Sequence, residues 1–134
     1  MARVAACMAM KGKLDNVRIL SEETVDAMQK DPLSAKMYKM FGFVTDFSQG
    51  GVNFYKTHEG MTPQRFKGTL LREGYVGWQG LGGSVLQWHP ELKIGFGFAR
   101  NLMHWYDFQN LTAATLQAEV VKCVNELNAI KSSL

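Results

Sequence analysis

The sequence contains few of the residues that build disulfide scaffolds or membrane spans. Its 134 residues include two cysteines, Cys7 and Cys123, and three prolines. Two distant cysteines outside any Cys-x-x-Cys pair cannot form a disulfide framework, and we expect both to be buried free thiols. No run approaches the roughly 18 apolar residues of a membrane-spanning helix, so no membrane span is expected. These features favour an intracellular location, cytoplasmic or mitochondrial.

The chain also lacks a strong excess of either charge. Fifteen lysines and arginines against twelve acidic residues give a formal charge of +3, and the basic residues are scattered singly. This distribution argues against a nucleic-acid partner. The histidines, His58, His89 and His104, form no His-x-x-x-His pair and have no cysteine nearby, so no metal site is expected. With 46% hydrophobic and 20% charged residues, the chain is suited to a packed core and a single domain.

Glycine, by contrast, is abundant and clusters in "GYVGWQGLGGS", from Gly74 to Ser84. The segment lacks the Gly-Lys-Ser/Thr end of a phosphate-binding loop, and Val85 holds the third glycine position of a dinucleotide motif. No cofactor is therefore expected. Glycines in a strand either let a ligand approach the backbone closely or only relieve crowding in a plain hairpin. Both interpretations stay open from the residues alone; in the first, backbone amides bind an anionic oxygen.

The N-terminal quarter of the chain predicts two helices. Small and apolar residues from Ala2 to Met10 predict a short helix that ends at Gly12. Ser21 is typical of an N-cap, and the helix that it starts ends at Asp31-Pro32. The residues expected on the inner side of this second helix are Leu20, Val25 and Met28.

Alternating apolar residues predict a run of strands in the middle of the chain. The expected strands are Met37–Phe47, Val52–Gly60, Glu73–Trp78, Gly83–Trp88 and Lys93–Arg100, with residues Met61–Leu71 ambiguous. In the last strand Ile94, Phe96 and Phe98 share one face, and Gly95, Gly97 and Ala99 share the other. Because neither face carries charge, we expect both to be covered, with a helix packed closely on the small face.

The apolar period changes after Asp107 and predicts a long C-terminal helix, capped by Asp107 or Asn110. Its inner stripe is expected to be Leu116, Val120, Cys123, Val124 and Leu127. The predicted fold class is therefore α+β, an antiparallel sheet with flanking N-terminal and C-terminal helices.

Three segments in this order carry a family resemblance: "ILSEETVDAM", "YKMFGFVTDF" and "VGWQGLGGSVLQWHPELKIGFGFARN". The chain resembles the C-terminal part of the serine β-lactamase and penicillin-binding-protein-like superfamily, in its class C-like branch of β-lactamase-related esterases and peptidases. The resemblance covers nearly the whole chain and is most specific from Gly77 to Asn101. It implies the C-terminal portion of the β-lactamase/transpeptidase-like fold, with residues 1–134 a single domain and a fragment of a larger one that lacks its N-terminal catalytic half.

The resemblance also assigns a substrate-binding strand. Trp78, Gln79 and Gly80 occupy the place of the family's Lys-Thr-Gly box, which lines one wall of the active site, and the amide of Leu81 is then one donor of the oxyanion hole. Tryptophan in place of lysine removes a cation that grips carboxylates. The implied substrates in the full-length protein are therefore small esters or amides with an uncharged acyl part.

Departures from the family pattern remove the catalytic residues. The family nucleophile lies in Ser-x-x-Lys, whereas the residues three positions after Ser21, Ser34, Ser48 and Ser84 are Thr24, Met37, Gly51 and Gln87. No tyrosine is followed two residues later by asparagine either. We therefore expect no catalytic residue in this chain, and Ser84 only packs or forms a local hydrogen bond.

Three functional classes follow. The first is the C-terminal part of a serine hydrolase that supplies the active-site edge strand and is inactive alone. The second is a non-catalytic interaction or scaffold module of the same fold, and the third is an unrelated small α+β protein. If the N-terminal half is missing, strand Lys93–Asn101 is an exposed edge. We then expect self-association through it, or its cover by the segment Val52–Gly60.

Overall fold

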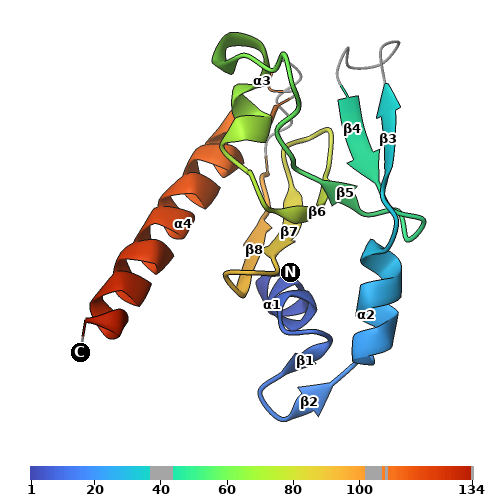
Figure 1. Ribbon diagram of the computed structural model, residues 1–134, viewed down its shortest axis with the longest axis vertical. Coiled ribbons are helices and arrows are strands. Elements are labelled where there is room, and N and C mark those ends of the chain that lie inside the picture. The colour runs from blue at the N-terminus through green and yellow to red at the C-terminus, as the bar shows by residue number, and fades with distance from the viewer. Residues whose placement is uncertain (37–43, 102–106, 108, 134) are drawn as a thin grey trace.

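The computed structural model describes residues 1–36, 44–101, 107 and 109–133 (Figure 1). Its centre is an antiparallel sheet in which strands adjacent in sequence are adjacent in space, in the order β3-β4-β5-β6-β7-β8. The strands are Leu33–Lys36 (β3), Val44–Phe47 (β4), Asn53–Phe54 (β5), Val76–Gln79 (β6), Val85–His89 (β7) and Ile94–Phe98 (β8). The predicted α+β class with an antiparallel sheet is confirmed.

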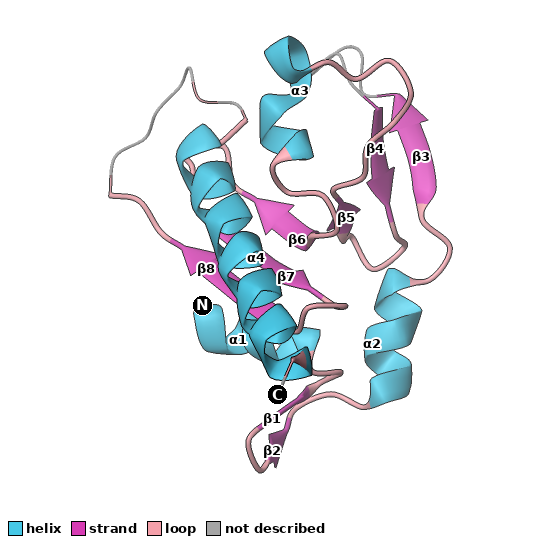
Figure 2. Cartoon of the chain, turned by 60° about the vertical axis from the view of Figure 1, so that its left-hand side comes forward, coloured by secondary structure: helices cyan, strands magenta, loops and turns pink. Residues whose placement is uncertain are grey.

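Helices flank the sheet, as Figure 2 shows. They are Ala2–Ala9 (α1), Glu22–Gln29 (α2), Pro63–Leu70 (α3) and Leu111–Ser132 (α4), and a small ribbon of Lys13–Leu14 (β1) and Val17–Arg18 (β2) lies between α1 and α2. The expected N-terminal and C-terminal helices are both present. No helix in the described part of the chain is long and apolar enough to cross a membrane.

The small face of β8 accepts α1 at very close range. A Cβ atom added at Gly95 would lie 2.1 Å from the backbone nitrogen of Ala6, and one at Gly97 would lie 2.6 Å from that of Ala2. Any side chain at these positions would displace the helix backbone. The prediction of a closely packed helix on the glycine face is therefore confirmed, and the helix is α1.

The opposite face of the sheet is covered by α4. Tyr75 and Ile94 form a buried cluster there, against which Phe96 and the α4 residues Val120, Val121 and Val124 pack. The predicted inner stripe of α4 is only partly correct, because Leu116, Cys123 and Leu127 are exposed. The inward face instead includes Ala113, Ala114 and Gln117. A buried polar partner described below makes Gln117 an inner residue, which apolar periodicity does not reveal.

The second helix follows its sequence signals closely. The Ser21 hydroxyl accepts a hydrogen bond from the Thr24 amide, 3.1 Å away, and caps α2. Val25 is fully buried in the core on the α1 face, with Leu20 and Met28 packed against it. The thiols differ from expectation: Cys7 of α1 is buried, whereas Cys123 of α4 is exposed.

The first strands differ from the predicted ones. Strand β3 was not predicted, and residues 37–43 of the expected strand Met37–Phe47 lie outside the described residues, while its end forms β4. The segment Val52–Gly60 contributes only Asn53–Phe54, which pairs with β4 and β6. It therefore does not cover β8, and that version of the edge prediction is wrong. The ambiguous segment before β6 contains α3, which starts at Pro63.

Candidate functional site

The outer edge of β6 is open where the predicted substrate-binding residues begin. Strand β5 pairs with Val76 and Gly77 of β6. The pairing extends toward the start of β6, because the Tyr55 amide donates to the Tyr75 carbonyl. No strand pairs with this edge at Trp78–Gln79 within the described part of the chain. An extended ligand can therefore lie beside β6 from Trp78 onward, as a strand would.

A tight turn follows β6 and leaves an amide free. The Gly80 amide donates to the Ser84 carbonyl at 2.7 Å, and the Gly83 amide donates to the Gly80 carbonyl at 3.0 Å. The second bond closes a β-turn, whose inner residues do not use their amides in it. Among the described residues the Leu81 amide has no hydrogen-bond partner. It lies where the family resemblance assigns an oxyanion donor.

The side chains along this edge are apolar and accessible. Trp78 is 53% exposed, and Leu81 is 50% exposed. The Phe47 ring of β4 lies 5.7 Å from the Trp78 ring, centroid to centroid, in a tilted arrangement. The Trp78 ring is therefore accessible to a ligand beside β6, and its role in substrate binding stays a prediction.

The start of α4 holds the turn in place. The Asn110 side-chain amide donates to the Gly80 carbonyl at 3.3 Å. Asn110 is the N-cap residue of α4 but its side chain caps no amide, and the Asp107 carboxylate instead accepts from the Leu111 amide at 2.8 Å. Arg100, which packs against Gly83 of the turn, forms an ion pair with the same carboxylate at 3.4 Å, so its charge is neutralised.

A buried arginine connects the start of α4 to the sheet. Arg72 is 1% exposed, and its guanidinium donates to the carbonyls of Gln109 and Asn110 at 2.6 and 2.8 Å and to the Gln117 side chain at 3.0 Å. Its charge also lies 5.2 Å from the centre of the Tyr55 ring. Burial lowers the pKa of Arg72, and Tyr55 and Asp107 oppose the shift. No salt bridge joins Arg72 to a carboxylate in the part of the chain described here.

The arginine network continues across the sheet. The Gln117 side-chain amide donates to the Gln87 carbonyl oxygen at 2.7 Å, and both residues are fully buried. Burial raises the pKa of the neighbouring Tyr75 to about 12, so it stays protonated. Sequence analysis missed these residues as a group. Apolar periodicity gave no signal for them, because the inner stripe that it predicts contains Leu116, Cys123 and Leu127 and not Gln117.

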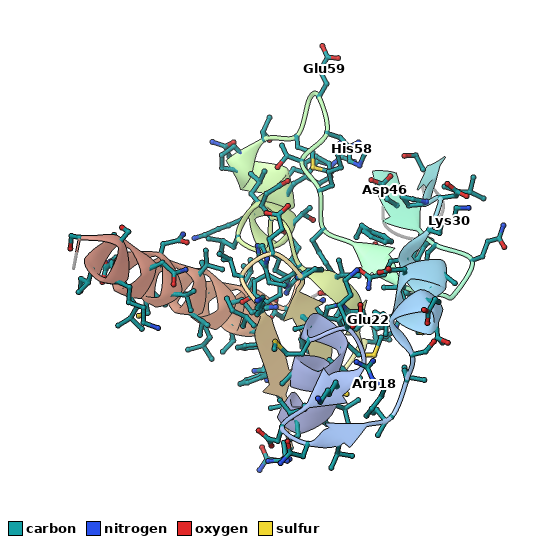
Figure 3. All side chains as sticks on the ribbon, turned by 60° about the horizontal axis from the view of Figure 1, so that its bottom comes forward. Arg18, Glu22, Lys30, Asp46, His58 and Glu59 are labelled. Atoms are coloured by element: carbon teal, nitrogen blue, oxygen red, sulfur yellow. The ribbon has the colours of Figure 1, made fainter. Side chains whose placement is uncertain are left out.

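A second polar cluster contains a serine, an aspartate and a histidine. The Asp46 carboxylate is buried and accepts from the Ser34 hydroxyl, and His58 lies 3.1 Å from its other oxygen (Figure 3). A nucleophilic triad needs the histidine between the serine and the acid. Here the carboxylate lies between them and no hydrogen bond joins Ser34 to His58. The cluster therefore does not activate the serine.

The histidines do not gather elsewhere in the described residues, where no group of three metal-ligating side chains occurs. His89 is buried at the end of β7, and its Nδ1 accepts from the Leu92 amide at 3.3 Å. Burial lowers the pKa of His89 and favours the neutral form that this bond requires. His104 lies outside the described residues.

The exposure of Trp78 is testable by fluorescence. A variant that keeps only Trp78, made by Trp88→Phe and Trp105→Phe, is expected to be quenched by acrylamide several-fold more efficiently than one that keeps only Trp88. The reason is that Trp88 is 4% exposed, whereas Trp78 is 53% exposed. Equal quenching of the two variants would place Trp78 in the interior and remove it from the candidate site.

Comparison with family models, curated proteins and solved structures finds no match for this chain.

Proposed function

We propose that this chain is the C-terminal part of a serine hydrolase of the β-lactamase-related family. In that protein it contributes an active-site strand and the oxyanion-hole backbone, while the nucleophile and its base come from an N-terminal half. The expected edge strand is corrected in one respect: β6 lies between β5 and β7, and only its Trp78–Gln79 part lacks a neighbour on the β5 side among the described residues. The observation that carries the proposal is the edge of β6. It is open from Trp78 and ends in a turn whose Leu81 amide has no partner among the described residues.

The turn after β6 suits acyl transfer because it presents a fixed backbone amide. An oxyanion forms on the substrate carbonyl oxygen during attack, and preorganised backbone amides stabilise it strongly in a site that excludes water. The Leu81 amide is held by the β-turn from Gly80 to Gly83 and by the Asn110 side chain on the Gly80 carbonyl. This donor therefore needs little reorganisation when a substrate binds.

The surroundings of the turn favour uncharged acyl groups. Trp78 replaces the family's lysine, and Arg100, the cation packed against Gly83, is already paired with Asp107. Phe47, Trp78 and Leu81 add apolar surface along the same edge. We therefore propose a small ester or amide substrate whose acyl part carries no carboxylate.

The isolated chain is expected to be catalytically silent. An oxyanion donor without a nucleophile and a base gives little acceleration, because these groups act as a unit. Purified chain should show no turnover of a chromogenic cephalosporin or of a short-chain nitrophenyl ester. Turnover that copurifies with the chain and survives Ser84→Ala would show a nucleophile that the proposal denies.

A non-catalytic interaction module is the alternative, favoured by one observation. Strand β8 ends the sheet, and its outer edge has no partner strand within the described residues. Both faces of β8 are covered, by α1 and by α4, so the backbone edge itself is the surface left for another chain.

Self-association through the β8 edge is therefore expected in the isolated chain. Light scattering after size exclusion should show a mass that rises with concentration, and amides of Ile94–Phe98 should become more protected from hydrogen exchange over the same range. The added strand pairs give this protection. A monomer at every concentration, with rapidly exchanging edge amides, would contradict the prediction.

A further inference from the structure

One side of α4 carries an unpartnered apolar stripe. Leu116, Leu127 and Ile130 are 45%, 56% and 58% exposed, and Cys123 is exposed as well. Together with the half-buried Val120, these residues repeat at intervals of four, three, four and three positions. That spacing is the a/d pattern of a coiled coil. We name these five residues the α4 seam.

Four of the five seam residues point away from the sheet that α4 covers. The face on the sheet is formed by Ala113, Gln117, Val120, Val121 and Val124, so Val120 lies at the border of the two faces, and the other seam residues lie about a quarter of a turn round the helix. From residue 125 to residue 133 every described position is exposed, and these last turns extend past the sheet (Figure 1). Helical turns without tertiary packing are marginal in water, so a partner along the seam would stabilise them.

Two charges flank the seam and lack partners. With Val120 and Leu127 at a positions, Glu126 takes a g position and Lys131 takes an e position. No ion pair involves either side chain among the described residues. In a parallel coiled coil, g side chains of one helix lie beside e side chains of the next heptad in the other helix. Glu126 would then face Lys131 of a second copy, twice by symmetry.

An antiparallel pair of the same helices lacks this match. It places g positions opposite g positions, which sets Glu126 near Glu126 of the other copy. Like charges at such positions weaken association and so select against that orientation. The charges therefore select the parallel arrangement of two identical seams.

We propose that the α4 seam is a docking surface for the α4 seam of a second copy of this chain, in parallel and in register. The proposal rests on α4 alone and does not depend on the proposed hydrolase function or on the β8 edge. It places Cys123, at a d position, opposite Cys123 of the second copy. The axes of packed helices lie about 8–10 Å apart and each Cα atom lies about 2.3 Å from its own axis, so two Cα atoms that face each other come within the range that a disulfide bridges.

Charge reversal tests the register. Glu126→Lys alone, or Lys131→Glu alone, should weaken the dimer about fivefold at low salt, because two symmetric surface pairs change from attraction to repulsion. The double variant carrying both changes should restore the original dissociation constant, measured by sedimentation equilibrium. A dimer insensitive to the single changes, or one that Glu126→Lys strengthens, would overturn the parallel register.

Oxidative cross-linking tests the contact itself. Mild oxidation should link two copies through Cys123, and Leu127→Asp should abolish the linked product. Cys7→Ser should leave it unchanged, because Cys7 is buried. The Leu127→Asp variant should still show the concentration-dependent protection of the Ile94–Phe98 amides, because the substitution lies on α4 and not on β8. This result distinguishes the α4 contact from association through the β8 edge. A monomeric chain, or linking that persists in Leu127→Asp, would overturn the proposal.

Discussion

Replacement of Arg72 by methionine is expected to lower the free energy of unfolding by about 3–5 kcal/mol. Methionine fills similar space and removes a buried charge, which by itself favours folding. However, the substitution leaves the Gln109 carbonyl and the buried Gln117 side-chain oxygen without their donor, whereas the Asn110 carbonyl keeps a bond from the Ala114 amide at 2.9 Å. An orphaned buried acceptor costs about 1–3 kcal/mol, so these losses outweigh the relieved desolvation.

The measurement for Arg72 is urea denaturation followed by circular dichroism. Arg3→Met is the matched control, because its side chain is 81% exposed and forms only a surface ion pair with Asp15, so a change below about 1 kcal/mol is expected. If Arg72→Met unfolds within about 1 kcal/mol of the natural chain, the arginine does not hold the start of α4.

Gly95→Val is expected to detach α1 from the sheet. The Cβ atom would lie 2.1 Å from the Ala6 nitrogen and 2.4 Å from its Cα atom, and these backbone atoms cannot swing aside as a side chain can. We expect a loss of about 3 kcal/mol or more, at the upper end of overpacking effects. Because Gly95 does not have a positive φ, the loss reports steric overlap alone.

The reaction rates of the two thiols measure the detachment of α1 directly. At a concentration low enough to keep the natural chain monomeric, Cys123 should react at once with a thiol reagent and Cys7 slowly, since only Cys123 is exposed. In Gly95→Val both should react quickly. Gly80→Ala is the matched control, because its Cβ atom would meet only the Ser84 carbonyl oxygen at 3.6 Å. A slow Cys7 in Gly95→Val would show that α1 accommodates the side chain.

The two substitutions bear differently on the candidate site. Arg72 holds the chain just before α4, and Asn110 in that segment donates to the Gly80 carbonyl of the turn after β6. Loss of Arg72 is therefore expected to loosen the turn that presents the Leu81 amide. Gly95 acts on the other face of the sheet, where α1 belongs to a core cluster that also contains Val76 of β6.

Local signals in the sequence predicted the features that depend on neighbouring residues. The Ser21 cap is one, because the hydroxyl and the Thr24 amide that it accepts from are three residues apart. The glycine face of β8 is another, because strand alternation alone separates Gly95 and Gly97 from Ile94 and Phe96. The open edge at Trp78 was expected from the family resemblance, and its backbone hydrogen bonds could not be read from the residues.

Tertiary structure decided which side of α4 faces the sheet. Apolar periodicity selected a stripe through Leu116, Cys123 and Leu127, and those residues are exposed. The helix turns instead toward Gln117, because the buried guanidinium of Arg72, 45 residues earlier, and the Gln87 side chain satisfy its amide group. A buried polar side chain needs hydrogen-bond partners, and here those partners come from residues far away in the sequence. No local pattern in the sequence can therefore predict that Gln117 faces the sheet.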